Sequence, residues 1–170
     1  MWIAIGIFVA ILFGVLIYVA IKKSFHKINT ALIQASEKLN FQYTPPESLW
    51  KKKVMSGTLD GYRCEITVYT QSNGQSSTTY ISFFTYFPES LNMGIKINWR
   101  GQFEGDGDHL SNLFIKRNLN LVEDEKKKLR RLKISDESVN SRKILWKKYY
   151  NPDEIIKTMN DVVALTKKLK

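Results

Sequence analysis

The sequence predicts an α+β fold: an N-terminal transmembrane helix, then a mainly antiparallel sheet of about five to seven strands packed by a juxtamembrane helix and a C-terminal helix. Three observations lead to this prediction. An uncharged apolar run fills Trp2–Ile21, alternating segments flank Asp60-Gly61, and a helix-start signal stands at Asn151. The expected parts are a transmembrane anchor over 1–22, a juxtamembrane amphipathic helix over 23–40 and a soluble α+β domain over 41–170.

The apolar run is long enough to cross a bilayer. As a helix it would measure about 30 Å, the thickness of the hydrocarbon core. A cleaved signal peptide is disfavoured because no basic residue precedes the run and no small-residue cleavage site follows it. A buried core helix would show a polar stripe. Lys22, Lys23 and Lys27 follow the run, so the positive-inside rule predicts headgroup contacts there and a cytoplasmic domain.

Gly6, Ala10 and Gly14 recur every four residues within the run. Small residues on one face let a second helix approach closely, which would allow pairing with another integral membrane protein or with a second copy. Glycine and alanine are also common in membrane helices in general, so both interpretations stay open.

The composition is strongly basic, with 26 Lys and Arg against 16 Asp and Glu and a net charge of +10. Such a balance fits an anionic membrane surface, acidic partners or nucleic acid. With an anchor the membrane surface needs no further assumption, and nucleic acid is not expected. Ordinary surface charge would explain each basic run equally well. The runs are Lys22–Lys27, Lys51–Lys53, Lys126–Arg131, Arg142–Lys148 and Lys167–Lys170.

Chemistry-bearing residues are few. One cysteine excludes an intramolecular disulfide, and two histidines with one cysteine exclude zinc sites built from four Cys/His ligands. No P-loop, serine nucleophile elbow or HExxH pattern occurs, so we expect no catalytic set, no cofactor and no metal. The acidic segment Gly101–Asn112 carries Glu104, Asp106, Asp108 and His109. Its spacing does not fit an EF-hand, and its glycines favour a tight turn over a metal site.

The sequence from residue 24 to residue 70 predicts one helix, a short strand and a β-hairpin. Ser24–Asn40 carries a single apolar stripe and should continue from the anchor, and Phe41–Tyr43 should be a short strand. Asp60-Gly61 predicts a two-residue turn between Val54–Leu59 and Tyr62–Thr70. In the second strand Cys64 alternates with polar residues, so we expect a buried core thiol rather than a nucleophile.

Thr79–Phe87 is an unusual predicted strand because both of its faces are aromatic. Tyr80, Phe84 and Tyr86 share the outer face. Either the strand is central and covered on both sides, or these three residues form a surface for a partner.

The remaining elements are predicted from alternation, charge order and caps. Met93–Arg100 and Leu113–Arg117 should be strands and Asn120–Leu132 a helix, with Lys133–Val139 and Lys143–Tyr149 as a hairpin turning at Asn140-Ser141. Asn151 should cap the last helix, with Pro152 at its first position and Asp153 and Glu154 in its first turn.

The order of parts resembles an uncharacterised family of bacterial single-pass membrane proteins with one α+β domain. The resemblance covers residues 30–169 and implies the fold order but no activity. Gly105-Asp106 matches a later turn of that family, whereas His109, Leu110 and Leu113 stand where the family carries Phe, Asp and Phe. The matching hairpin reads Gly57-Thr58-Leu59-Asp60-Gly61-Tyr62-Arg63-Cys64-Glu65-Ile66.

These observations predict a non-enzymatic accessory or scaffold subunit of a bacterial inner-membrane complex, with a single-pass anchor and a cytoplasmic domain. Its expected contacts are membrane lipid and another membrane protein. The alternative is a membrane-anchored module that binds anionic lipid or another polyanion through basic patches. Salt should separate the two, because polyanion binding weakens steeply as ionic strength rises.

Overall fold

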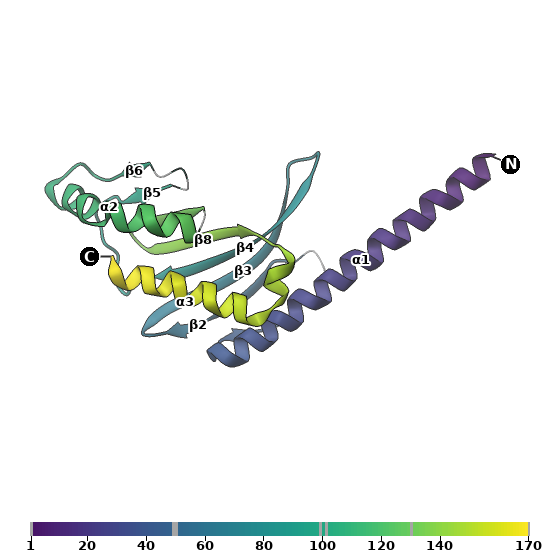
Figure 1. Ribbon diagram of the computed structural model, residues 1–170, viewed down its shortest axis with the longest axis horizontal. Helices are drawn as coiled ribbons and strands as arrows, with labels where there is room; N and C mark the ends of the chain where they lie inside the picture. Colours follow the sequence, from purple (N-terminus) through teal and green to yellow (C-terminus); the bar gives the residue numbers. More distant parts are fainter. Residues whose placement is uncertain (1, 49–50, 99, 101, 130, 170) are drawn as a thin grey trace.

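A computed structural model of the chain describes residues 2–48, 51–98, 100, 102–129 and 131–169; the side chains of residues 2–7, 9 and 10 lie outside this description. The described residues form an α+β fold in which three helices pack on one antiparallel sheet (Figure 1). The elements are α1 (Trp2–Leu39), β1 (Gln42–Tyr43), β2 (Lys53–Leu59), β3 (Tyr62–Ser72), β4 (Ser77–Tyr86), β5 (Lys96–Ile97), β6 (Phe103–Glu104), α2 (His109–Leu129), β7 (Leu132–Ser135), β8 (Ser138–Ile144), η1 (Lys147–Tyr150) and α3 (Pro152–Lys168).

Helix α1 is continuous, as the sequence predicts for the junction of the first two parts. Its N-terminal half projects away from the domain, whereas Ile28, Leu32 and Ala35 are buried in the core (Figure 1). Phe8 and the apolar side chains of residues 11–21 are exposed. Where side chains are described, no helix is long and apolar enough to cross a membrane.

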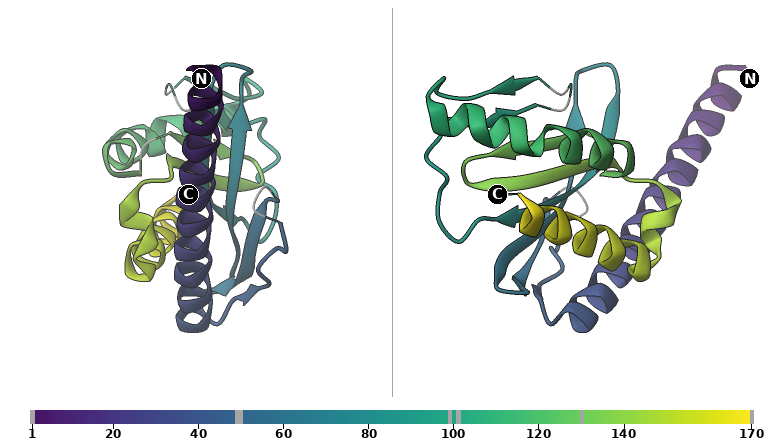
Figure 2. Two further views of the ribbon diagram at one scale, coloured as in Figure 1. Left: turned by 90° about the vertical axis from the view of Figure 1, so that its right-hand side faces the viewer. Right: turned by 60° about the vertical axis from the view of Figure 1, so that its left-hand side comes forward.

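The sheet has eight strands in the order β1-β2-β3-β4-β8-β7-β5-β6, and every pair is antiparallel. The described helices all lie on one face, with α1 beside β1 and β2 and with α3 over the centre (Figure 2). The β2–β3 hairpin turns at Asp60-Gly61 as predicted, since both residues have the positive φ of the expected turn (53° and 85°).

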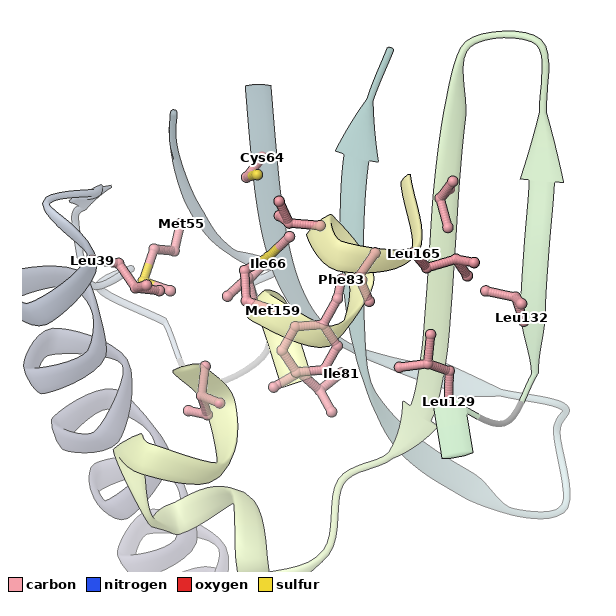
Figure 3. Packing of buried hydrophobic residues seen from close by; sticks show 14 of the residues in the cluster. Leu39, Met55, Cys64, Ile66, Ile81, Phe83, Leu129, Leu132, Met159 and Leu165 are labelled. Carbon is pink, nitrogen blue, oxygen red and sulfur yellow. The ribbon is translucent and has the colours of Figure 1, made fainter. Parts of the chain in front are cut away.

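The core lies between the sheet and the helices. Ile66 and Phe83 from the middle strands meet Met159 of α3, and Leu39 meets Met55 at the α1 end (Figure 3). Cys64 is fully buried, which confirms the predicted core position. Helix α3 begins as predicted: the Asp153 amide donates to Asn151 Oδ1 at 3.0 Å.

One predicted strand is wrong. Leu113–Arg117 belongs to α2, and the predicted helix Asn120–Leu132 is the second half of that helix, which ends at Leu129. Phe114, Val122 and Leu129 are buried on one side of α2. Their spacing is that of one helix over the whole of His109–Leu129. The glycine-rich segment Gly101–Asn112 suggests a loop that extends past the true start of this helix, so its first turns resemble a separate short strand.

The predicted turn at Asn140-Ser141 is also wrong, because both residues lie inside β8. The chain turns instead at Asp136-Glu137. The predicted strand Met93–Arg100 is shorter in the structure: among its described residues, Lys96–Ile97 form β5 and pair with β6 and β7. Trp99 lies outside the described residues.

Candidate binding surfaces

The sheet face opposite the helices is the most extensive candidate site. On β4, Phe83 points into the core and is fully buried, whereas Tyr80, Phe84 and Tyr86 lie half-buried on the other face. None of the described helices covers this face (Figure 2). The predicted partner residues therefore lie together on a face that none of the described helices covers. The alternative, a central strand covered on both sides, is met only in part: β4 lies inside the sheet, but the described helices pack on its other face.

Three arginines stack on these aromatic rings. The Arg142 guanidinium lies 4.8 Å from the Tyr80 ring centre, and that of Arg131 lies 5.6 Å from the same ring centre. Arg63 lies 4.9 Å from the ring centre of Tyr86. Such cation–π contacts hold the guanidinium groups at the surface with hydrogen-bond donors still available to a ligand.

A cavity of about 490 Å³ opens on this face between β3, β4, β8, β7 and β5. Lys96, Lys133 and Arg142 line it against a single carboxylate, Glu104. Arg142 Nη1 donates to the Tyr69 hydroxyl at 3.4 Å. Burial raises the pKa of Tyr69, but hydrogen bonds with Arg142 and Ser82 and the positive charges of Arg142 and Lys133 outweigh it, so the pKa is lowered overall. The cavity favours a bound negative charge.

A second cavity, of about 520 Å³, joins two basic runs that are far apart in the sequence. Ser141 Oγ donates to the Leu129 carbonyl at 2.6 Å, which holds the end of α2 against β8. Among the residues that the structure describes, six cations and no carboxylate line this basic cavity, and Trp146 beside them is 65% exposed. Lys128 reaches Asp161 outside the cavity at 2.7 Å. The lining cations are Lys127, Lys128, Arg131, Arg142, Lys143 and Lys148.

The juxtamembrane lysines lie near the same end of the domain. Lys22, Lys23 and Lys27 are exposed, and a cavity lined by Lys23 and Lys27 is closed on its other side by Lys147 and Tyr150 of η1. Residues of three of the predicted basic runs therefore lie around η1. The run Lys167–Lys170 lies elsewhere, where Lys167 pairs with Asp60 at 2.8 Å.

The predicted helix-pairing face is only partly described. Gly14 is surrounded by open space, since a methyl group built on it meets no atom within 4 Å. The side-chain positions of Gly6 and Ala10 lie outside the description.

The acidic segment before α2 serves the fold. Asp108 accepts a hydrogen bond from the Ser111 amide at 2.7 Å, and the backbone and side-chain hydrogen bonds of Ser111 lower the pKa of Asp108. Asp106 packs against Gly94, and its amide donates to the Met93 carbonyl at 3.0 Å. Among the described residues, no three His, Cys, Asp or Glu side chains converge in a way that could hold a metal ion.

Cys64 and Lys53 are buried groups with reactive potential. Burial raises the pKa of Cys64, which disfavours the nucleophilic thiolate. Lys53 is 5% exposed and lies in β2 beneath α1, with Nζ 4.2 Å from the Phe25 ring centre. Sequence reasoning missed this position by counting Lys53 in a basic run. The alternation of the strand indicates it, because Lys53 stands two residues before the buried Met55 and so lies on the same face of β2.

Comparison of the chain with models of protein families, with curated proteins and with solved structures gave no match.

Proposed function

We propose that the protein is a non-enzymatic accessory or scaffold subunit of a bacterial inner-membrane complex. Trp2–Ile21 would be its single transmembrane anchor, the domain would lie in the cytoplasm, and the open sheet face would receive an acidic segment of a partner protein. The observation that carries the proposal is the accessible aromatic and cationic surface of β3, β4 and β8.

The anchor is supported by the exposed apolar side chains of residues 11–21, which lie on a helix that projects clear of the domain. Water would solvate such a surface poorly, whereas a bilayer would cover it. The lysines that follow at 22, 23 and 27 are exposed, and with such an anchor they would lie among the lipid headgroups.

The partner chemistry follows from the charge of the open face. Arg63, Lys133 and Arg142 present guanidinium and ammonium groups around the rings of Tyr80, Phe84 and Tyr86. Aromatic side chains and arginine are the residues that contribute most to binding at protein interfaces. An acidic segment with one or two apolar side chains would complement both features.

Site-specific photo-crosslinking in native membranes tests the docking surface. A photoreactive phenylalanine analogue replaces Phe84, and the matched control replaces Asn160, which is exposed on α3 on the opposite face. We expect one defined partner to crosslink from position 84 through an acidic peptide, and the Arg142→Glu variant to lose it. Equal crosslinking from both positions, or none from position 84, would refute docking on this face.

The basic cavity supports a second candidate function, binding of a polyanion. Heparin chromatography of the detergent-solubilised full-length protein tests this second function, because the detergent covers the anchor and the salt needed for elution measures polyanion binding. If the cavity binds polyanions, Lys143→Glu with Lys148→Glu should elute at markedly lower salt than Lys157→Glu, a control on the exposed side of α3. Equal elution of the variants would remove this candidate.

A further inference from the structure

An apolar cavity of about 500 Å³ lies between α1 and the β3–β4 strands. Ile21, Phe25 and Ile28 of α1 form one wall, and Val68 and Leu145 lie across from them. Of the described residues that line it, Lys53 alone is charged. The volume lies in the range typical of pockets for small ligands.

Burial of the Lys53 ammonium in this cavity is unfavourable, because the group loses its hydration without gaining an ion pair with any described residue. Its side chain is 5% exposed, and burial lowers its pKa. Among the described residues no carboxylate forms an ion pair with it, whereas its exposed neighbour Lys52 pairs with Glu65 at 3.7 Å. The Phe25 ring, 4.2 Å from Nζ, is the contact it makes. A buried ammonium without a carboxylate is costly, and an anion in the cavity would offset that cost.

The cavity lies at the depth where lipid headgroups would be. Ala20 and Ile21, at the end of the apolar run, line its membrane side. Phe25, which contacts the Lys53 ammonium, follows Ile21 by one turn of α1, about 6 Å along the helix axis. A lipid with its headgroup at Lys53 would therefore direct its acyl chain past Ile21 into the bilayer.

Hydroxyl groups supply the remaining contacts that a phosphate requires. Ser24, Ser77 and the pair Thr70 and Thr79 line the cavity beside Lys53, and the two threonine hydroxyls are 3.0 Å apart. Hydroxyls can donate to phosphate oxygens while the ammonium provides the charge.

We propose that this cavity holds one anionic phospholipid of the surrounding leaflet, with its phosphate at Lys53 and an acyl chain that runs past Ile21 into the bilayer. The lipid fixes the orientation of the domain relative to its anchor. This inference rests on the proposed membrane anchor, but it is independent of the docking face.

Native mass spectrometry of the full-length protein tests it, after reconstitution in bilayers that contain phosphatidylglycerol and phosphatidylcholine. We expect wild type to retain one phosphatidylglycerol, and Lys53→Met to reduce that retention at least tenfold. The matched control Lys52→Met removes the same charge one residue away and should retain the lipid. Ser24→Phe, which fills the cavity and leaves Lys53 in place, should also lose it.

Several outcomes would overturn the proposal. These are equal retention of phosphatidylcholine, unchanged retention in Lys53→Met, or displacement of the lipid by inorganic phosphate or by palmitate at equal concentration. The two competitors identify a general anion site and a fatty-acid site respectively. Thermal unfolding should show Lys53→Met folded, because methionine removes a buried charge and keeps the volume.

Alkaline carbonate extraction separates this inference from the anchor. If wild type is extracted from membranes, the anchor has failed. If wild type and Lys53→Met both stay in the membrane and neither retains phosphatidylglycerol, only the lipid site has failed.

Discussion

Asp136 shows how a single carboxylate decides the course of the chain. It accepts hydrogen bonds from three successive amides, those of Met93 at 3.3 Å, Gly94 at 2.9 Å and Ile95 at 2.9 Å. These bonds join the β7–β8 turn to the segment that leads into β5. Sequence reasoning placed the turn at Asn140-Ser141 because asparagine and serine favour turns, and it could not foresee that Asp136 finds its partners some forty residues earlier.

Asp136→Ala should lower the free energy of unfolding by about 2–3 kcal/mol, because the three amides lose a charged acceptor. Asp136→Asn should cost less, since one oxygen remains to accept. Urea unfolding of the full-length protein measures both. Glu137→Ala, an exposed change in the same turn, should stay within about 0.5 kcal/mol of wild type. An equal effect of the two alanine variants would contradict the role of Asp136.

Tyr69 reports the positive potential of the open sheet face. Burial raises its pKa, but the hydrogen bonds and charges of Arg142, Ser82 and Lys133 lower it overall. The folded protein should therefore form the phenolate before an unfolded chain does, and stability should rise with pH from the folded pKa up to the ordinary value near 10.

An ultraviolet titration, taken as the difference between wild type and Tyr69→Phe, isolates this hydroxyl. Arg142→Met should move the Tyr69 transition to higher pH, while Arg63→Met, a control on the same face, should leave it in place. No movement in Arg142→Met would show that the guanidinium does not set the potential there.

Helix α3 and helix α2 differ in how clearly the sequence marks their starts. Asn151-Pro152 with two carboxylates is a complete local signal, and α3 begins where the sequence predicts. Asp108 caps α2 in a similar way, but glycines surround it and suggest a turn. The β2–β3 hairpin was predictable because Asp60-Gly61 fixes it locally. By contrast β5, β6 and β7 are short strands, and β5 joins the sheet by pairing with β7, which lies far away in the sequence, so no local pattern encodes its place.

A matched pair of variants measures how much the Asn151 cap of α3 contributes to the free energy of unfolding. Asn151→Ala removes the acceptor of the Asp153 amide and should cost about 1 kcal/mol, whereas Asn151→Ser keeps an acceptor and should cost only a few tenths. Because α3 covers the centre of the sheet, the loss should appear in global unfolding by urea. Equal stability of the two variants would show that Pro152 and the first-turn carboxylates suffice to start the helix.

At the scale of the whole molecule, the surfaces were less predictable than the fold. The aromatic outer face of β4 could be expected from alternation within one strand. The basic cavity could not, because it unites the end of α2 with β8 and η1 through contacts such as that of Ser141 with Leu129. The Lys53 cavity likewise depends on where α1 crosses the sheet. The basic cavity is lined by residues of η1, and the Lys53 cavity by residues 20–28 of α1, so both lie toward the side of the domain where α1 packs.

The anchor proposal makes the last prediction. Two aspartates in the middle of the run, Ile11→Asp with Leu12→Asp, should each cost about 3 kcal/mol in the bilayer centre and release the full-length protein from carbonate-washed membranes. Lys157→Asp with Asn160→Asp, a control on the exposed side of α3, should leave it in the pellet. A C-terminal tag on wild type should be digested by protease in inverted vesicles only. Digestion from the exterior of spheroplasts would place the domain on the other side, and retention of the double aspartate variant would show that another surface holds the protein to the membrane.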